Sequence, residues 1–182
     1  MFRFLETNDI YKRHWLNLVY LQPYQLNFIM KSILLALVSL LFLSCLSDGG
    51  DSKVVDYTVQ NEKEIVDYIA KNNLNAQNSN SGLYYVINEA GTGVQPTAAS
   101  NVTVAYKGSF TNGNVFDQSD ASGVSFGLNQ VIKGWTEGIP YFKEGGNGIL
   151  LVPAHLGYGS CGRPGISGGA VLIFEVKLIK VN

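Results

Sequence analysis

The chain has 182 residues, of which 46% are hydrophobic, 12% aromatic and only 15% charged, a composition that supports a packed core and excludes a wholly disordered chain. The formal net charge of −1 leaves no basic excess to neutralise a phosphate backbone, which argues against a nucleic-acid partner. Two cysteines and two histidines are too few for a disulfide scaffold or a zinc cluster.

The N-terminal region carries a short apolar run. Residues 33–43 are almost wholly apolar, too short to span a hydrocarbon layer of about 30 Å comfortably but suited to the apolar part of a secretory signal. Met30, followed by a lysine, is typical of a translation start with a minimal positive region, so residues 30–44 are predicted to be a signal peptide. Residues 1–29 would then be a mis-assigned start or an unstructured extension. The alternative is one long, interrupted membrane anchor over residues 15–43.

The apolar run ends in Phe42-Leu43-Ser44-Cys45, which resembles a bacterial lipobox. In such signals the cysteine is acylated and becomes the first mature residue, so Cys45 is predicted to carry a lipid that anchors the protein in the cell envelope. Phe42 departs from the usual leucine, and the alternative is an incidental cysteine. Residues 45–60 begin with small, polar and acidic residues, as expected of a flexible tether. They are similar to the start of surface lipoproteins of Bacteroidetes-type bacteria.

A helix is predicted after the tether. Asn61 can cap it, with Glu64 three residues later in a capping-box arrangement. Three apolar residues recur at the i, i+3 and i+4 spacing of one helix face: Ile65, Tyr68 and Ile69. The helix and a polar loop are predicted to fill residues 61–82. The apolar face suits either a solvated spacer or a docking or dimerising arm, and the sequence leaves both open.

Strands dominate from residue 83 onward. They are predicted over residues 83–87, 101–110, 148–152 and 171–181. A hairpin turn at residues 111–114 contains an Asn-Gly pair, which tolerates positive φ, and the chain returns through residues 115–117. One short helix is predicted over residues 129–139. The fold class is therefore α+β, with a largely antiparallel sheet wrapped on one short helix and preceded by the helical extension.

Five short motifs occur in order in this region. They are Val-x-Val-x-Tyr-x-Gly (102–108), Asn-Gly-x-Val-Phe-Asp-x-Ser (112–119), Val-Ile-x-Gly-Trp-x-Glu-Gly (131–138), Leu-Gly-Tyr-Gly (156–159) and Leu-Ile-Phe-Glu-Val-x-Leu (172–178). In this order and spacing they closely resemble the FKBP-type peptidyl-prolyl cis-trans isomerases. The resemblance covers residues 83–182. It implies a strongly curved antiparallel sheet around a short helix, and an enzyme that catalyses rotation about Xaa-Pro bonds.

The chemistry of such an enzyme can also be argued from side chains. Rotation about an ordinary amide bond has a barrier of about 18–20 kcal/mol because resonance is lost in the twisted state. The twisted amide is less polar, so a dry, aromatic-walled pocket favours it relative to water. No covalent intermediate, metal or cofactor is needed. Six aromatic residues in or beside the predicted strands and helix could build this pocket: Tyr106, Phe116, Phe126, Trp135, Tyr158 and Phe174.

The resemblance implies a role for individual residues. Trp135 corresponds to the floor against which a proline ring packs. The walls correspond to Tyr106, Phe116, Phe126, Val131 and Phe174. The backbone N–H of Ile132 would hold a substrate carbonyl, and the Tyr158 hydroxyl would donate a hydrogen bond from the rim. Asp117 would orient or polarise the site, so that Asp117, Tyr158 and Phe116 are the predicted catalytic residues. Without the resemblance, the simpler interpretation is that the aromatic residues are core and Asp117 belongs to a turn.

Residues 160–169 depart from the family pattern. The segment is similar to a shortened, more flexible form of the family loop that overhangs the pocket, with Arg163 where a histidine often stands. Ile166 is predicted to line the site. The departure bears on substrate preference among proline-containing polypeptides and on the affinity for macrolide inhibitors.

Two alternatives to an isomerase stay open. The first is an FKBP-like chaperone or peptide-binding module with little turnover, which the altered loop leaves room for. The second is a surface lipoprotein whose domain only docks a partner. In that case the helix within residues 61–82 would be the docking element, and its deletion would leave any isomerase activity intact.

Overall fold

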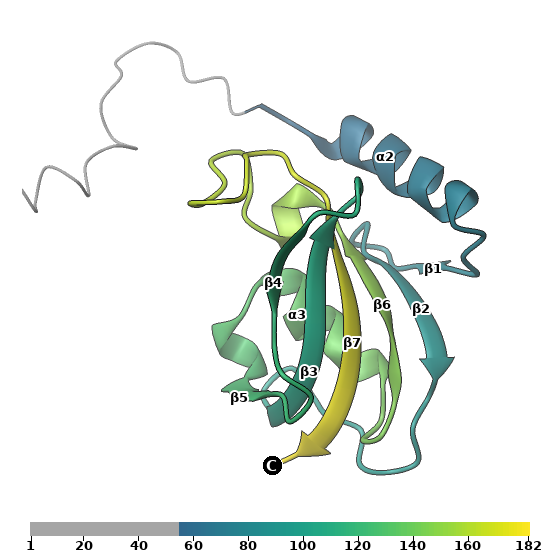
Figure 1. The fold of residues 1–182 in the computed structure, drawn as a ribbon, viewed down its shortest axis with the longest axis vertical. Coiled ribbons are helices and arrows are strands. Elements are labelled where there is room, and N and C mark those ends of the chain that lie inside the picture. Colours follow the sequence, from purple (N-terminus) through teal and green to yellow (C-terminus); the bar gives the residue numbers. More distant parts are fainter. Residues whose placement is uncertain (1–54) are drawn as a thin grey trace, which may run out of the picture. The chain divides into compact units, whose positions relative to one another are not determined.

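The structure is a computed structural model and describes residues 55–182 (Figure 1). The predicted signal peptide, the predicted lipid site at Cys45 and most of the predicted tether lie outside the described residues. The described residues belong to one compact unit. In this part of the chain, no helix has both the length and the apolar character that crossing a membrane requires.

Within the described residues, seven strands form one antiparallel sheet. They are β1 (Gln77–Asn78), β2 (Tyr84–Glu89), β3 (Asn101–Phe110), β4 (Val115–Gln118), β5 (Val124–Gly127), β6 (Asn147–Val152) and β7 (Leu172–Val181). Their order is β1-β2-β6-β7-β3-β4. Because β7 pairs with one edge of β3 along its length, β4 and β5 share the other edge, one near each end of β3. The α+β fold with a curved antiparallel sheet is confirmed, and the predicted strands agree with the observed ones to within two residues.

The single helix predicted over residues 129–139 is wrong in its extent. The regular helix α3 covers only Lys133–Gly138, between the 3₁₀ turns η1 (Leu128–Gln130) and η2 (Ile139–Tyr141). Val131 and Ile132 are extended instead. Two β-branched residues in a row, followed by two glycines within six positions, make a continuous helix unfavourable here.

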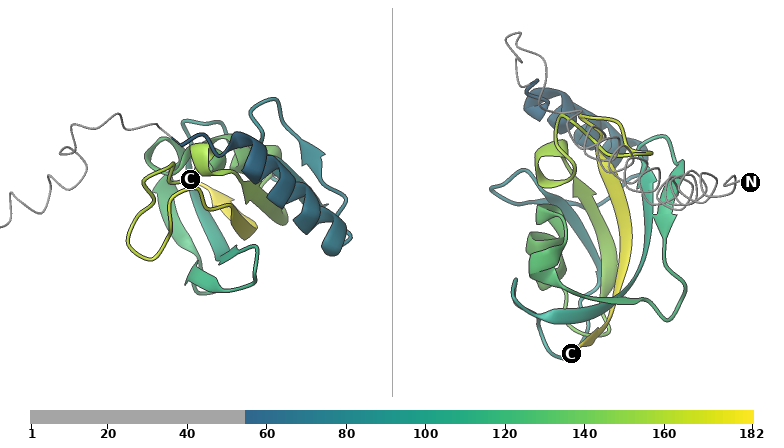
Figure 2. Two further views of the ribbon diagram at one scale, coloured as in Figure 1. Left: turned by 90° about the horizontal axis from the view of Figure 1, so that it is seen from above. Right: turned by 90° about the vertical axis from the view of Figure 1, so that its left-hand side faces the viewer.

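Helix α3 lies on the hollow side of the curved sheet (Figure 2). Its two glycines explain how it packs closely against β6. A Cβ on Gly134 would lie 2.5 Å from Cγ1 of Val152, and a Cβ on Gly138 would lie 2.7 Å from Cδ2 of Leu150. These two glycines are four residues apart and so share one helix face. The space between α3 and the sheet is filled by the main core, which includes Leu83, Val102, Val104, Leu128, Phe142, Leu150 and Leu172.

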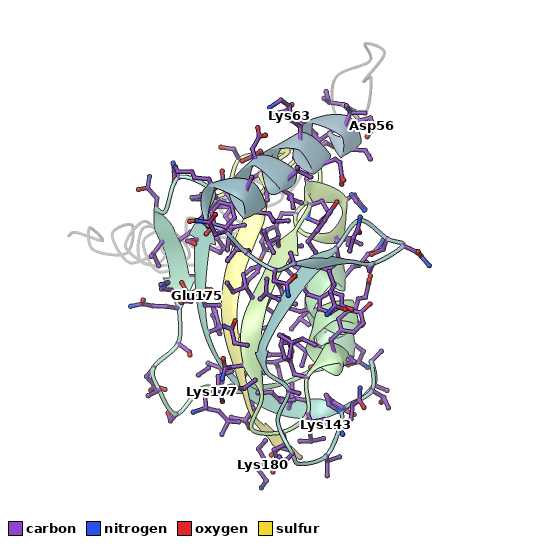
Figure 3. All side chains as sticks on the ribbon, turned by 90° about the vertical axis from the view of Figure 1, so that its right-hand side faces the viewer. Asp56, Lys63, Lys143, Glu175, Lys177 and Lys180 are labelled. Atoms are coloured by element: carbon purple, nitrogen blue, oxygen red, sulfur yellow. The ribbon has the colours of Figure 1, made fainter. Side chains whose placement is uncertain are left out.

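The outer face of the sheet is partly covered by helix α2 (Thr58–Lys71) (Figure 3). Ile65 of α2 is buried against Leu151 of β6 and Ile173 of β7. Side chains alternate between the two faces of a strand, so Leu151 and Ile173 point away from the main core that their neighbours enter. Tyr68 and Ile69 pack beside Ile65, so the apolar face of the predicted helix is used by the domain's own sheet.

The N-terminus of α2 differs from the prediction. The helix begins at Thr58, four residues earlier than a cap at Asn61 implies, with Tyr57 at the N-cap position. The carboxylate of Asp56 accepts hydrogen bonds from the Thr58 N–H (2.9 Å) and the Thr58 hydroxyl (2.6 Å). The predicted cap at Asn61 is wrong, because Asn61 lies inside the helix and its side chain binds residues of the domain far along the chain.

Candidate active site

A cavity of about 460 Å³ opens beside α3 at the β4 and β5 edge of β3. It is lined by Tyr106, Phe116, Asp117, Val124, Phe126, Gln130, Val131, Ile132, Trp135, Tyr158, Arg163 and Phe174. Of the site residues predicted from the sequence within the described part, all but Ile166 therefore lie together. The sequence analysis did not assign Val124 and Gln130 to the site, and it treated Arg163 only as a departure from the family.

The aromatic residues form one connected cluster around Trp135. The ring centroids of Tyr106 and Phe174 lie 5.0 and 5.1 Å from that of Trp135, both with interplanar angles of 80°. Phe126 lies 5.3 Å from Trp135, and Phe116 contacts Phe174 edge-on at 5.7 Å. Such edge-to-face contacts suit the quadrupoles of the rings. Trp135 is only 6% exposed, so the cluster holds its indole in one place as part of the cavity wall.

Gly108 of β3 makes the close packing of this wall possible. It pairs with Asp117 of β4 on one side and with Phe174 of β7 on the other. A Cβ at this position would lie 2.7 Å from the Phe116 ring and 3.0 Å from the Phe174 ring. The glycine that ends the Val-x-Val-x-Tyr-x-Gly motif is therefore required because two aromatic side chains occupy the space of its missing Cβ.

The polar side of the cavity is organised by Tyr106 and Asp117. The Tyr106 hydroxyl donates a hydrogen bond to Oδ2 of Asp117 at 2.9 Å. Burial raises the pKa of Tyr106 to about 12, with further contributions from this hydrogen bond and from the negative charge of Asp117. The hydroxyl therefore stays protonated at neutral pH and holds the carboxylate in a defined orientation on the cavity wall.

The raised pKa of Tyr106 leads to a prediction about stability. The folded state favours the neutral Tyr106 hydroxyl. Its contribution to the free energy of unfolding is therefore complete below the ordinary tyrosine pKa of 10.0 and is lost as the pH rises toward about 12. We expect the difference in unfolding free energy between the wild type and Tyr106→Phe to be constant between about pH 7 and about pH 9, and to shrink above about pH 10. Urea unfolding at several pH values measures it, and a decrease that is already complete at about pH 9 would contradict the prediction.

The backbone at the start of α3 presents a hydrogen-bond donor to the cavity. The carbonyl of Ile132 accepts from the N–H groups of Trp135 (2.9 Å) and Thr136 (3.1 Å). The N–H of Ile132 itself makes no hydrogen bond to any group within residues 55–182. Ile132 lines the cavity, so this donor is available to a bound carbonyl.

The rim of the cavity comes from the segment between β6 and β7. The Arg163 guanidinium lies over the Tyr158 ring, 4.4 Å from its centroid, in a cation–π contact. Arg163 and Ile166 exchange both backbone hydrogen bonds, at 2.8 and 2.9 Å, so the loop folds back on itself. Ile166 lies in the main core, where it is 4% exposed, and not in the cavity lining for which it was predicted.

Comparisons with known proteins agree with this arrangement. A family model described as FKBP-type peptidyl-prolyl cis-trans isomerase matches residues 93–179. The FKBP-type peptidyl-prolyl cis-trans isomerase FkpA of Buchnera aphidicola is 45% identical over 109 residues, which are 59% of this chain and 43% of that protein. The crystal structure of a peptidyl-prolyl cis-trans isomerase from Pseudomonas syringae has a TM-score of 0.63 at 29% identity, and the match covers 74% of this chain and 99% of that one. The crystal structure of FkpA from Escherichia coli has a TM-score of 0.58 at 31% identity, covering 98% of this chain and 99% of that one.

The fold, the motifs and these matches place the chain in the FKBP-type peptidyl-prolyl cis-trans isomerase family, to which it belongs through the domain described above. The chain spans less than half the length of the curated relatives it matches.

Proposed function

We propose that the chain is a peptidyl-prolyl cis-trans isomerase that acts on proline-containing polypeptides. The observation that carries the proposal is the indole of Trp135, enclosed by three aromatic contacts at an apolar cavity that also holds an oriented carboxylate. A proline ring fits such a cavity, and the aromatic wall excludes water from the amide. The enzyme then favours the twisted amide because this state has lost resonance and is less polar than the planar ones.

Individual groups would contribute by binding and orientation. The N–H of Ile132, which has no hydrogen-bond partner within residues 55–182, would bind a substrate carbonyl and so fix the peptide on one side of the rotating bond. The Tyr158 hydroxyl, which donates no hydrogen bond within the described residues, would bind a second peptide group at the rim. Asp117, held by Tyr106, would lie beside the twisting amide and stabilise its altered charge distribution. Each factor of ten in rate requires about 1.4 kcal/mol of such differential stabilisation.

The test of the function is catalysed cis/trans exchange of a short Xaa-Pro peptide, followed by NMR with the purified full-length chain. The proposal expects exchange that is faster than the uncatalysed reaction in proportion to enzyme concentration. Binding without acceleration would overturn it and favour the peptide-binding module. Macrolide inhibitors are proposed to occupy the same cavity, so a bound macrolide should stop the exchange.

We also propose that the protein acts outside the cytoplasm, anchored to the cell envelope through a lipid on Cys45. The proposal is supported by the lipobox-like Phe42-Leu43-Ser44-Cys45 after an eleven-residue apolar run. The mature chain would begin at Cys45, followed by a tether that leads to α2. Mass spectrometry of membrane-extracted protein is expected to find an acylated Cys45 as the first residue. An unmodified N-terminus at Met1 would exclude the lipid anchor.

A further inference from the structure

A buried polar side chain on α2 is hydrogen-bonded to the loop that forms the rim of the cavity. Asn61 is only 1% exposed. Its Nδ2 donates to the carbonyl of Gly169 at 2.8 Å, and its Oδ1 accepts from the N–H of Ala154 at 2.8 Å. A single side chain thus binds two backbone groups that are fifteen residues apart in the segment between β6 and β7. Within residues 55–182, neither group has another hydrogen-bond partner.

The two groups bound by Asn61 lie at the two ends of the rim loop, which we define as residues 154–169 between β6 and β7. Ala154 opens the 3₁₀ turn η3 (Ala154–Leu156), two residues before the Leu-Gly-Tyr-Gly motif that contains Tyr158. Gly169 closes the loop, because its N–H donates to the carbonyl of Gly159 at 3.0 Å. The loop and the start of α2 lie at the same end of the domain in Figure 1. Asn61 therefore connects the entry and the exit of the segment that carries Tyr158 and Arg163.

A second contact from α2 acts on the same point. The Tyr57 ring lies where a side chain of Gly169 would be, since a Cβ on Gly169 would be 2.3 Å from a carbon of that ring. Gly169 also has φ +78°, which favours glycine. At the end of the rim loop, Gly169 thus packs against the aromatic ring of Tyr57 and is hydrogen-bonded to Asn61. Both residues lie at the N-terminal end of α2.

We infer that Asn61 is a positioning residue of the isomerase site, and that α2 sets the place of Tyr158 and Arg163 at the cavity rim. The inference rests on the proposed function. Floor and wall residues belong to β3, β4, β5, β7, α3 and the turn before α3, which do not depend on Asn61 for hydrogen bonds. Loss of the two bonds leaves a buried N–H and a buried C=O unpaired, a cost that movement of the loop toward water would relieve. The rim would then be displaced while the floor stays in place.

Displacement of the rim should affect peptide binding more than turnover. For full-length Asn61→Ala we expect the KM for an Xaa-Pro peptide to rise about three- to tenfold, with kcat changed less than about twofold. The reason is that the rim contributes to peptide binding, whereas the floor and Asp117 stabilise the twisted amide. The matched control is Ile65→Ala on the same helix. It removes apolar contacts in the cluster of Leu151, Val171 and Ile173 but none of the hydrogen bonds to the loop, so it should lower stability but leave KM unchanged.

A loop readout without substrate makes the test independent of the isomerase proposal. In Asn61→Ala the NMR signals of the Tyr158 ring and the Gly169 amide should shift, while in Ile65→Ala they should not. If the wild type catalyses no exchange but Asn61→Ala shows these shifts, the proposed function is refuted and the positioning role of Asn61 is kept. Unchanged signals and KM in Asn61→Ala, or equal changes in Ile65→Ala, would overturn the inference. If Asn61→Ala does not fold, Asn61→Leu keeps a side chain of similar size and lacks both hydrogen-bonding groups, and it should show the same rise in KM.

Discussion

Replacement of Trp135 with leucine is expected to lower kcat/KM for an Xaa-Pro peptide about 100-fold, equivalent to about 2.7 kcal/mol of transition-state stabilisation. Leucine keeps an apolar side chain at the floor but removes the flat surface and the three ring contacts that hold it. The proline ring would then lose its principal contact, and water could reach the amide. NMR exchange measured over a range of peptide concentrations gives kcat and KM separately.

The control for this variant must be a core residue of comparable burial that does not line the cavity. Phe142 is fully buried in the same core and is absent from the cavity lining. Phe142→Leu should therefore destabilise the fold and leave kcat/KM within about twofold of the wild type. A Trp135→Leu enzyme that retains a third or more of the wild-type kcat/KM would show that the indole is not the floor of the active site.

Gly148→Ala is expected to lower the free energy of unfolding by about 3 kcal/mol or more, the largest stability effect that we predict for a single added methyl group. A Cβ at this position would lie 1.9 Å from the carbonyl oxygen of Val86 and 2.8 Å from the ring of Phe142. The oxygen belongs to the backbone of β2, which pairs with β6, so relief requires the two strands to separate. Thermal or urea unfolding of the variant measures the loss.

Gly113→Ala separates this steric effect from the ordinary cost of replacing glycine. Gly113 has φ +89° in the β3–β4 turn, and no atom lies within 4 Å of the position of its Cβ. Its replacement should cost only about 1 kcal/mol, from left-handed backbone strain. Equal losses in the two variants would mean that the approach of β2 to β6 does not determine the cost at Gly148.

The parts of the fold that sequence analysis predicted well depend on local signals. Strand β3 has the predicted bounds because Val102 and Val104 alternate with polar residues and an Asn-Gly turn ends the strand. Strand β5 was not predicted. It is four residues long, and its pairing with residues 101–104 of β3 depends on the fold of the whole domain. Val124 was missed as a site residue for the same reason.

Residues that act over long distances along the chain were harder to predict. Asn61 has a sequence context that favours a helix cap, but its hydrogen-bond partners are 93 and 108 residues away. Nothing local distinguishes a capping asparagine from one that binds a distant loop. The predicted cavity residues lie in the family motifs, except for Phe126, which was assigned from the wider resemblance. Their assembly from β3, β4, β5, β7 and α3 depends on the sheet order, which the motifs alone do not specify.

The place of β7 in the sheet has a consequence for biosynthesis. β7 follows the other described strands in the chain, yet it lies between β6 and β3 and supplies Ile173 to the packing of α2 and Phe174 to the cavity wall. Without it, β3 and β6 have no common neighbour. The sheet therefore closes only after β7 has been synthesised, because β7 pairs with both β3 and β6. A truncation that removes Leu172–Val181 should therefore abolish the fold.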